Sequence, residues 1–380
     1  MPLPSPAELL SQLVAIDSVN PDLVPGGAGE ANIAAFVTAW LENAGLDVSL
    51  HEAAPNRPNV IAVAKGTGRG RSLMLNAHLD TVGVAGMESP FQPRIADGRL
   101  YGRGAYDMKG SLAACMLTMA AVQSMELAGD VIFTGVVDEE YASLGTQAIA
   151  DRWKADAAIV TEPTAMQLCI AHKGFVWLEV ETIGKAAHGS RPDLGVDAIT
   201  KMGRVLVGLD QLAEQLQAGT RHPLLGTGSI HASLISGGQE LSSYPERCRC
   251  QVERRTIPGE TPAIVEAQIQ AILDGVRGTD LAFQASLRTT MVRDSFEIAD
   301  DAPIVTALRE QAASTLHSSP NITGATFWMD SALLSAAGIP TVVFGPGGEG
   351  AHAVVEWVDL EQVAQCVEIY TATARAFCHD

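Results

Sequence analysis

Five short segments of the chain each place a histidine, aspartate or glutamate after a run of apolar residues or within a glycine-rich turn. The segments are NAHLDTV, GRGAYDMKG, VVDEEYASLG, VTEPT and GPGGEGAHAVVEW, and their candidate ligands are His78, Asp107, Glu139, Glu140, Glu162 and His352. They supply two imidazoles and three carboxylates, with one carboxylate left over. Such ligands suit catalytic zinc. The set therefore predicts a two-zinc centre that activates water for hydrolysis.

His78 and Asp80 directly follow the apolar run 72–77, which predicts a strand. Residues two apart in a strand project to the same face, and open α/β sheets place their sites at the carboxyl ends of strands. We therefore expect His78 to bind metal and Asp80 to orient it or raise its basicity. A His-x-Asp pattern is common by chance, so its weight comes from the other segments.

Asp107 lies in a turn with glycines on both sides, at Gly102, Gly104 and Gly110. Glycines let the backbone approach an ion closely, and a carboxylate there can bridge two cations about 3.5–4 Å apart. The alternative for Asp107 alone is a helix N-cap.

Glu139 and Glu140 follow the apolar run 131–137. Neighbouring loop residues can point to different sides, so one glutamate can bind metal while the other faces substrate as a general base. Glu162 follows a strand predicted at 157–161, and His352 follows a glycine-rich turn after a strand predicted at 341–344. A helix cap or a hydrogen-bonded polar residue would explain any one of these candidate ligands alone. Helix caps do not explain all five segments together.

The remaining pattern predicts an α/β fold with an insertion. Apolar runs at 59–64, 72–77, 131–137 and 157–161 alternate with helical stretches near 109–128 and 144–152. This alternation indicates a mostly parallel sheet covered on both faces. From about residue 174, strand-like runs at 176–180, 229–236 and 248–255 and two amphipathic helices predict a compact α+β unit. After about residue 290 the α/β pattern resumes.

Composition narrows the class of protein. The chain has 44 acidic and 25 basic residues and a formal charge of −19, which disfavours binding to nucleic acid or to anionic membranes. The six cysteines show no CxxC pairing, so neither a zinc ribbon nor a disulfide framework is indicated, and Cys248 and Cys250 are expected in the core. With no leader pattern and no long apolar run, we expect a cytoplasmic protein.

These motifs, in this order and across nearly the whole chain, resemble the M20 metallopeptidase and aminoacylase family. The family includes acetylornithine deacetylase, succinyl-diaminopimelate desuccinylase and carboxypeptidase G2. The resemblance implies that His78, Asp107 and Glu162 hold one zinc ion. It implies that Asp107, Glu140 and His352 hold the other, with two zinc ions per subunit and cobalt or manganese as alternatives.

In the same way, the resemblance implies that Glu139 is the general base and that Asp80 supports the ligands from behind. It implies a di-zinc catalytic domain formed by residues 1–173 and 288–380, and a lid and dimerisation domain formed by residues 174–287. It therefore also implies a homodimer.

Two residues of the inserted segment gain a role from the resemblance alone. His188, in Ala187-His188-Gly189-Ser190, would stabilise the oxyanion, in cis or across the dimer. Arg255, in the sequence RRTIPGE, would clamp the α-carboxylate of the substrate, a task suited to a planar bidentate donor. The adjacent Arg254 is the alternative, and Arg255 is preferred because it falls at the arginine of the family's R-x-x-P-G motif.

We expect a metal-dependent amide hydrolase that removes the acyl group from an N-acyl-amino acid, in the manner of acetylornithine deacetylase. The segment Thr161-Glu162-Pro163-Thr164 and the R-x-x-P-G arginine favour that branch. A dipeptidase or carboxypeptidase on the same scaffold is the first alternative. A catalytically silent dimeric binding protein is the second, and the complete set of ligands argues against it.

Overall fold

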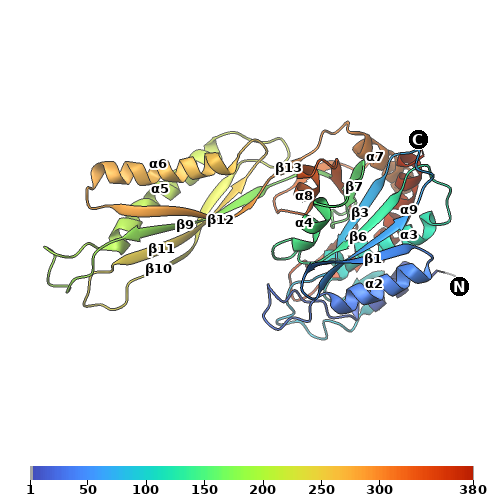
Figure 1. Cartoon of the computed structure of the whole chain (residues 1–380), viewed down its shortest axis with the longest axis horizontal. Helices are drawn as coiled ribbons and strands as arrows, with labels where there is room; N and C mark the ends of the chain where they lie inside the picture. The colour runs from blue at the N-terminus through green and yellow to red at the C-terminus, as the bar shows by residue number, and fades with distance from the viewer. Residues whose placement is uncertain (1–2, 380) are drawn as a thin grey trace. The chain divides into compact units, whose positions relative to one another are not determined.

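The computed structural model describes residues 3–379, which form two compact units (Figure 1). The first unit comprises the chain up to Ile170, the segment Ile298–Thr323 and the chain from Met329 onward. The second comprises Ala171–Glu297 and Gly324–Trp328. The predicted α/β class with an added α+β unit is confirmed. The exact domain limits, and the roles of the inserted segment as lid and dimerisation domain, stay predictions.

The first unit is built on a mixed sheet with the strand order β1-β2-β6-β3-β7-β15-β8. Its strands are β1 (Asp47–Ala54), β2 (Arg57–Ala64), β3 (Leu73–His78), β6 (Val131–Val136), β7 (Ala157–Val160), β8 (Leu168–His172) and β15 (Thr341–Val343). Two short strands, β13 (Phe296–Glu297) and β14 (Ile322–Ala325), pair with β8; β13 and the last two residues of β8 already belong to the second unit. The pairs β6-β3, β3-β7 and β7-β15 are parallel, and the outer pairs are antiparallel. The predicted parallel pairing therefore holds at the centre of the sheet, whereas the sheet as a whole is mixed.

Helices cover this sheet on both faces, and every residue of β3, β6 and β7 is therefore buried. The helices are α1 (Pro6–Val14), α2 (Ala31–Asn43), α3 (Gly110–Val122), α4 (Leu144–Ala150), α7 (Pro303–Leu316), α8 (Ser331–Ala336) and α9 (Leu360–Phe377). Helix α3 packs on β6, β3 and β2 and is contacted by α9. Helix α1 begins as predicted, with a capping box between Ser5 and Glu8.

A small antiparallel sheet in the first unit joins two parts of the chain that are far apart in sequence. Its strand order is β16 (Gly348–Glu349), β17 (Trp357–Asp359), β5 (Arg99–Tyr101) and β4 (Arg94–Ala96). A short π-helical turn, η1 (Ala105–Lys109), lies between β5 and α3. The sheet therefore brings the turn with Asp107 close to the loop with His352.

The second unit is an antiparallel sheet covered on one face by two helices. The sheet runs in the order β10 (Ser229–Gly237), β11 (Arg247–Thr256), β9 (Gly174–Ile183) and β12 (Gln284–Arg293). Alternate residues of β9 and β11 are buried against α5 (Ala198–Ala218) and α6 (Pro262–Thr279). Cys248 and Cys250 lie in this core as free thiols, as predicted. The sequence pattern did not predict β12, whose polar residues outnumber its apolar ones.

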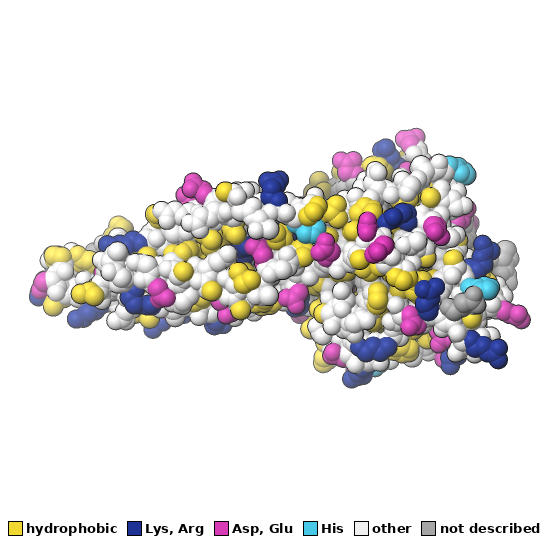
Figure 2. All heavy atoms as spheres, turned by 90° about the horizontal axis from the view of Figure 1, so that it is seen from above, with side chains coloured by type: hydrophobic (Ala, Val, Ile, Leu, Met, Phe, Trp, Pro, Cys, Tyr) yellow, Lys and Arg dark blue, Asp and Glu magenta, His cyan; other side chains and the backbone are white. Residues whose placement is uncertain are grey.

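Charged side chains of both signs are interspersed over the face seen in Figure 2. Within residues 3–379, no helix has both the length and the apolar character needed to cross a membrane.

Candidate metal centre

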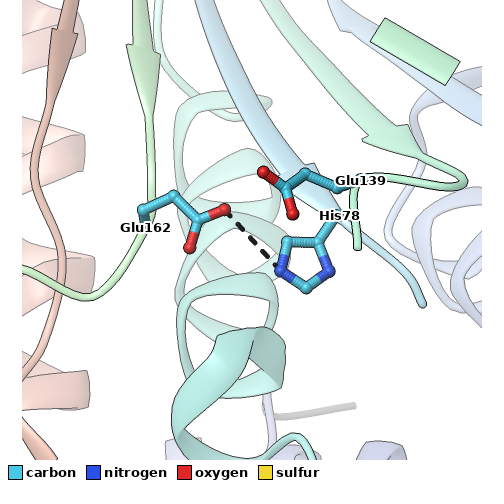
Figure 3. A group of neighbouring side chains, drawn as sticks. All are labelled: His78, Glu139 and Glu162. Atoms are coloured by element: carbon cyan, nitrogen blue, oxygen red, sulfur yellow. Dashed lines mark ion pairs between the residues drawn. The ribbon is translucent and has the colours of Figure 1, made fainter. Parts of the chain in front are cut away.

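Three adjacent parallel strands deliver three of the predicted site residues to one place. His78 ends β3, Glu139 follows β6, and Glu162 follows β7. Because these strands are neighbours and run in the same direction, their carboxyl ends meet. Figure 3 shows the three side chains turned toward one another, with His78 Nε2 lying 3.6 Å from Glu162 Oε1. Ligand atoms of all three lie within 4.8 Å of one another.

Asp107 and His352 complete the cluster from the other two segments. Asp107 Oδ1 lies 3.1 Å from His78 Nε2, whereas its Oδ2 lies 3.5 Å from His352 Nε2. His352 Nε2 also lies 3.0 Å from Glu140 Oε2. The two oxygens of Asp107 thus face two different histidines, which is the arrangement that a carboxylate bridging two cations requires.

Asp80 supports the candidate metal centre in two ways, through its backbone carbonyl and through its carboxylate. The imidazole of His78 donates from Nδ1 to the backbone carbonyl of Asp80 at 2.9 Å, which leaves Nε2 to face the carboxylates. The Asp80 carboxylate is 3.7 Å from Nδ1 and instead accepts the backbone N–H groups of Glu139 and Glu140, each at 3.1 Å. Its side chain therefore fixes the turn that carries both glutamates.

The crowding of acids changes their protonation. Burial, with further repulsion from Glu162, raises the pKa of Glu139 well above its usual value. Burial and the charge of Asp107 raise the pKa of Glu140 to about 7. Hydrogen bonds with Asp107 and Glu140 raise the pKa of His352 to about 10. The raised pKa values mean that Glu139, Glu140 and His352 tend to hold protons, and these protons offset the negative charge of the clustered carboxylates.

The donor set fits divalent cations. Glu140 Oε1 is buried and has no hydrogen-bond partner within residues 3–379, and a buried carboxylate oxygen without a donor is costly unless a cation is close. Imidazole nitrogens and carboxylate oxygens are ligands for zinc, cobalt or manganese.

A buried network behind the centre was not predicted from the sequence. Asn20 donates to the carboxylates of Asp80 at 2.7 Å and Asp138 at 3.0 Å. Arg57 pairs with Asp138 at 2.9 Å and also with the buried Glu30. These residues hold Asp138, which lies directly before Glu139, and Glu30 also accepts the backbone N–H of Asp138.

Asp330 is a further carboxyl group that the sequence gave no reason to select. Burial raises its pKa to about 6, while a hydrogen bond from Thr146 opposes this. Its charge is one of the influences that raise the pKa of Glu139.

The two remaining predicted site residues lie in the second unit. The exposed His188 accepts the backbone N–H of Ser190 at Nδ1, at 3.2 Å, so a neutral ring carries its proton on Nε2. Arg254 is fully buried on β11 and pairs with Glu260. Arg255 lies on the opposite face of the strand, partly exposed, and pairs with Glu253 at 2.7 Å. Of the two arginines, Arg255 is the one that a ligand can reach.

The sequence profile of peptidase family M20/M25/M40 matches residues 74–376. The chain belongs to this family. It is 31% identical to an acetylornithine deacetylase of Myxococcus xanthus, over 99% of this chain and 98% of the relative. It is 28% identical to an N-formyl-4-amino-5-aminomethyl-2-methylpyrimidine deformylase of Halalkalibacterium halodurans, over 98% of this chain and 95% of the relative.

The fold of this M20 chain also matches that of a solved Bacillus subtilis structure, described as a dinuclear metal binding peptidase from the M20 family. The TM-score is 0.77, the identity is 16%, and the match covers 98% of this chain and 97% of the other. The family resemblance predicted from the motifs is confirmed, and with it a hydrolase that acts on amide or peptide bonds.

Proposed function

We propose that this M20 chain removes a small acyl group from an N-acyl-amino acid by metal-dependent hydrolysis. The observation that carries the proposal is the placement of Asp107, whose two carboxylate oxygens face His78 and His352 separately. Beside it, Glu139 is close enough to His78 and Glu162 to reach a water molecule in the same centre.

Two cations would be held by residues of the first unit. His78, Glu162 and Asp107 would hold one, and Asp107, Glu140 and His352 the other. When bound, zinc, cobalt or manganese lowers the pKa of water and polarises the carbonyl of the substrate.

Glu139 then acts as the base. Its carboxylate accepts a proton from the attacking water and afterwards gives that proton to the nitrogen of the leaving amine. Burial raises its pKa, which suits a group that must both take and return a proton.

Residues of the second unit would bind the substrate. His188, protonated on Nε2, would donate to the developing oxyanion, a contribution of about 10²- to 10³-fold in rate for a well-placed donor. Arg255 would hold the α-carboxylate, exchanging its bond to Glu253 for one to the substrate.

The names of the relatives favour a small acyl group. One is named for removing acetyl and the other for removing formyl, although the amines that they release differ. The acyl-amino acid is preferred here because a partly exposed Arg255 suits a carboxylate. Cleavage of unblocked dipeptides remains the alternative.

We further propose a homodimer formed through the second unit. Strand β10 is an edge strand, and its residues Leu234 and Ile235 are 65% and 56% exposed. Apolar side chains on an unpaired edge favour pairing with another chain. Light scattering of the wild type and of Leu234→Lys tests this proposal.

The cytoplasmic location stays a prediction.

The test of the function is release of free amine from a panel of substrates by chelated enzyme, before and after zinc is added. The panel contains N-acetylornithine, N-succinyl-diaminopimelate, N-formyl amines without a carboxylate, and unblocked dipeptides. Zinc-restored cleavage of the acyl-amino acids alone supports the proposal. Cleavage of dipeptides alone supports the peptidase, and no cleavage by a metal-loaded protein contradicts both.

A further inference from the structure

Glu356 is a buried carboxylate that binds the turn containing Asp107. Its Oε1 accepts the backbone N–H groups of Tyr106 at 2.9 Å and Asp107 at 3.1 Å. Its Oε2 accepts the N–H of Gly104 at 3.0 Å and the guanidinium of Arg103 at 2.6 Å. The side chain of Glu356 is 0% exposed. Both carboxylate oxygens of Glu356 therefore accept their hydrogen bonds from residues 103–107, the turn that contains Asp107.

The backbone N–H groups of this turn need a hydrogen-bond acceptor that lies outside the turn. Gly104 has a left-handed backbone, with φ of 76°, and Asp107 and Met108 have non-helical angles inside η1. The N–H groups of Gly104, Tyr106 and Asp107 are bound by Glu356, and a buried N–H group without a partner would be costly. The carboxylate of Glu356 thus stabilises the conformation that directs the Asp107 side chain toward His78 and His352.

The same residue is also tied to the loop that contains His352. Glu356 lies directly before β17, which pairs with β5, and its backbone carbonyl accepts the N–H of Gly102 at 3.2 Å. Arg103 donates from Nη1 to Glu356 and from Nη2 to the carbonyl of Ala353 at 3.0 Å, one residue after His352. The Arg103–Glu356 pair therefore connects the two ligand-bearing loops.

We propose that Glu356 is a positioning residue that sets the distance between Asp107 and His352 and so determines the affinity of the cation held with Glu140. The inference rests on the proposed two-cation function. The other cation depends less on Glu356, because His78 and Glu162 come from the ends of β3 and β7, which Glu356 does not contact. Residues behind metal ligands typically change affinity by about 10- to 100-fold when they are removed.

The most informative change is Glu356→Gln, which keeps size and removes charge. One carboxylate oxygen becomes an NH₂ group, which would face the N–H of Gly104 or the guanidinium of Arg103. Donor then meets donor, and Arg103 loses its charged partner while buried. Because such a variant can lose stability as a whole, Arg103→Lys serves as a milder second variant. It keeps a positive charge beside Glu356 but cannot also reproduce the bond to Ala353.

A matched control exists in the second unit. Glu260 pairs with the buried Arg254 and accepts the N–H of Ile257 at 2.9 Å. Glu260→Gln thus removes a carboxylate that serves a buried arginine and a backbone amide, as Glu356→Gln does, but in the unit that contains none of the proposed metal ligands.

The experiment is titration of Co²⁺ into metal-free protein, followed by visible absorption and by competition with a chelator. We expect the wild type and Glu260→Gln to bind two cations per chain. We expect Glu356→Gln to bind the cation held with Glu140 about 10- to 100-fold more weakly and the other cation, which shares only Asp107 with it, with a smaller loss of affinity. Arg103→Lys should be weakened at the same site to a lesser extent. If Glu356→Gln does not fold, Arg103→Lys decides.

Two results would overturn the inference while leaving the proposed function standing. One is that both variants bind two cations as the wild type does. The other is that both affinities fall equally in Glu356→Gln. A wild type that binds fewer than two cations would instead contradict the proposed centre itself, and the inference with it.

Discussion

Asn20 donates a hydrogen bond of 2.7 Å to the carboxylate of Asp80. The same amide group donates to Asp138 at 3.0 Å, and Asp80 accepts the N–H groups of Glu139 and Glu140. Asn20 therefore separates two buried carboxylates and supports the turn that bears the proposed base.

The first prediction concerns this amide. Asn20→Ala leaves Asp80 and Asp138 without their shared donor, so we expect a loss of about 1–3 kcal/mol in the free energy of unfolding. Because the turn with Glu139 also moves, kcat should fall by about 10- to 100-fold with little change in KM. Steady-state kinetics and thermal unfolding measure both effects.

Asn76→Ala provides the control for that variant. Asn76 is also buried, and its amide donates to the hydroxyl groups of Thr134 and Thr146. It should cost similar stability but lower kcat much less than Asn20→Ala does, because its partner Thr146 is linked to Glu139 only through Asp330. Equal losses of kcat in the two variants would mean that Asn20 acts only through stability.

The second prediction separates base from ligand. Glu139→Gln cannot accept a proton, so kcat should fall by at least about 10²- to 10⁴-fold, while the bound metal measured by elemental analysis stays at the wild-type level. Glu139 also lies within reach of His78 and Glu162. Simultaneous loss of metal and turnover would therefore make Glu139 a ligand.

The third prediction concerns the stability of the metal-free protein. Burial raises the pKa of Glu140 from 4.5 to about 7, so the folded state holds a proton that the unfolded state releases over this range. Its contribution to stability is complete below pH 4.5 and is lost as the pH rises toward 7. The raised pKa of His352 acts in the same direction, with its contribution lost between 6.5 and about 10.

Thermal unfolding across this pH range tests the third prediction. The metal-free protein should become less stable as the pH rises, and the gain from added zinc should grow, because a bound cation favours the charged carboxylates. Glu140→Gln should flatten the profile of the metal-free protein. A gain from zinc that does not change with pH would count against the cluster as the metal site.

The fourth prediction concerns substrate recognition. Arg255→Lys keeps the charge but loses the bidentate geometry, so KM for an N-acyl-amino acid should rise by about tenfold, equivalent to about 1.4 kcal/mol. KM for an N-acyl amine without a carboxylate should stay the same. An equal rise for both substrates would show that Arg255 does not bind the carboxylate.

The ligand positions were predictable because each follows a strand or a glycine-rich turn, and strand ends of a parallel sheet meet. His78 and Glu162 show this directly. By contrast, Glu356 forms hydrogen bonds with residues about 250 positions away in sequence, such as Tyr106 and Asp107. Nothing local distinguishes it from a surface glutamate.

The same limit applies to the arginines of β11. Successive residues of a strand face opposite sides, so a shift of one residue in register would exchange Arg254 and Arg255. The partners settle which is buried: Arg254 pairs with Glu260 inside, and Arg255 pairs with Glu253 on the open face. The strand pattern of the sequence alone is compatible with either Arg254 or Arg255 facing the core.

The most direct test of the two-cation centre is anomalous X-ray scattering from crystals of the zinc-loaded enzyme, recorded above and below the zinc absorption edge. We expect two zinc peaks, one on each side of the Asp107 carboxylate, the first beside His78 and Glu162 and the second beside Glu140 and His352. A single peak, or two peaks of which one makes no contact with Asp107, would contradict it.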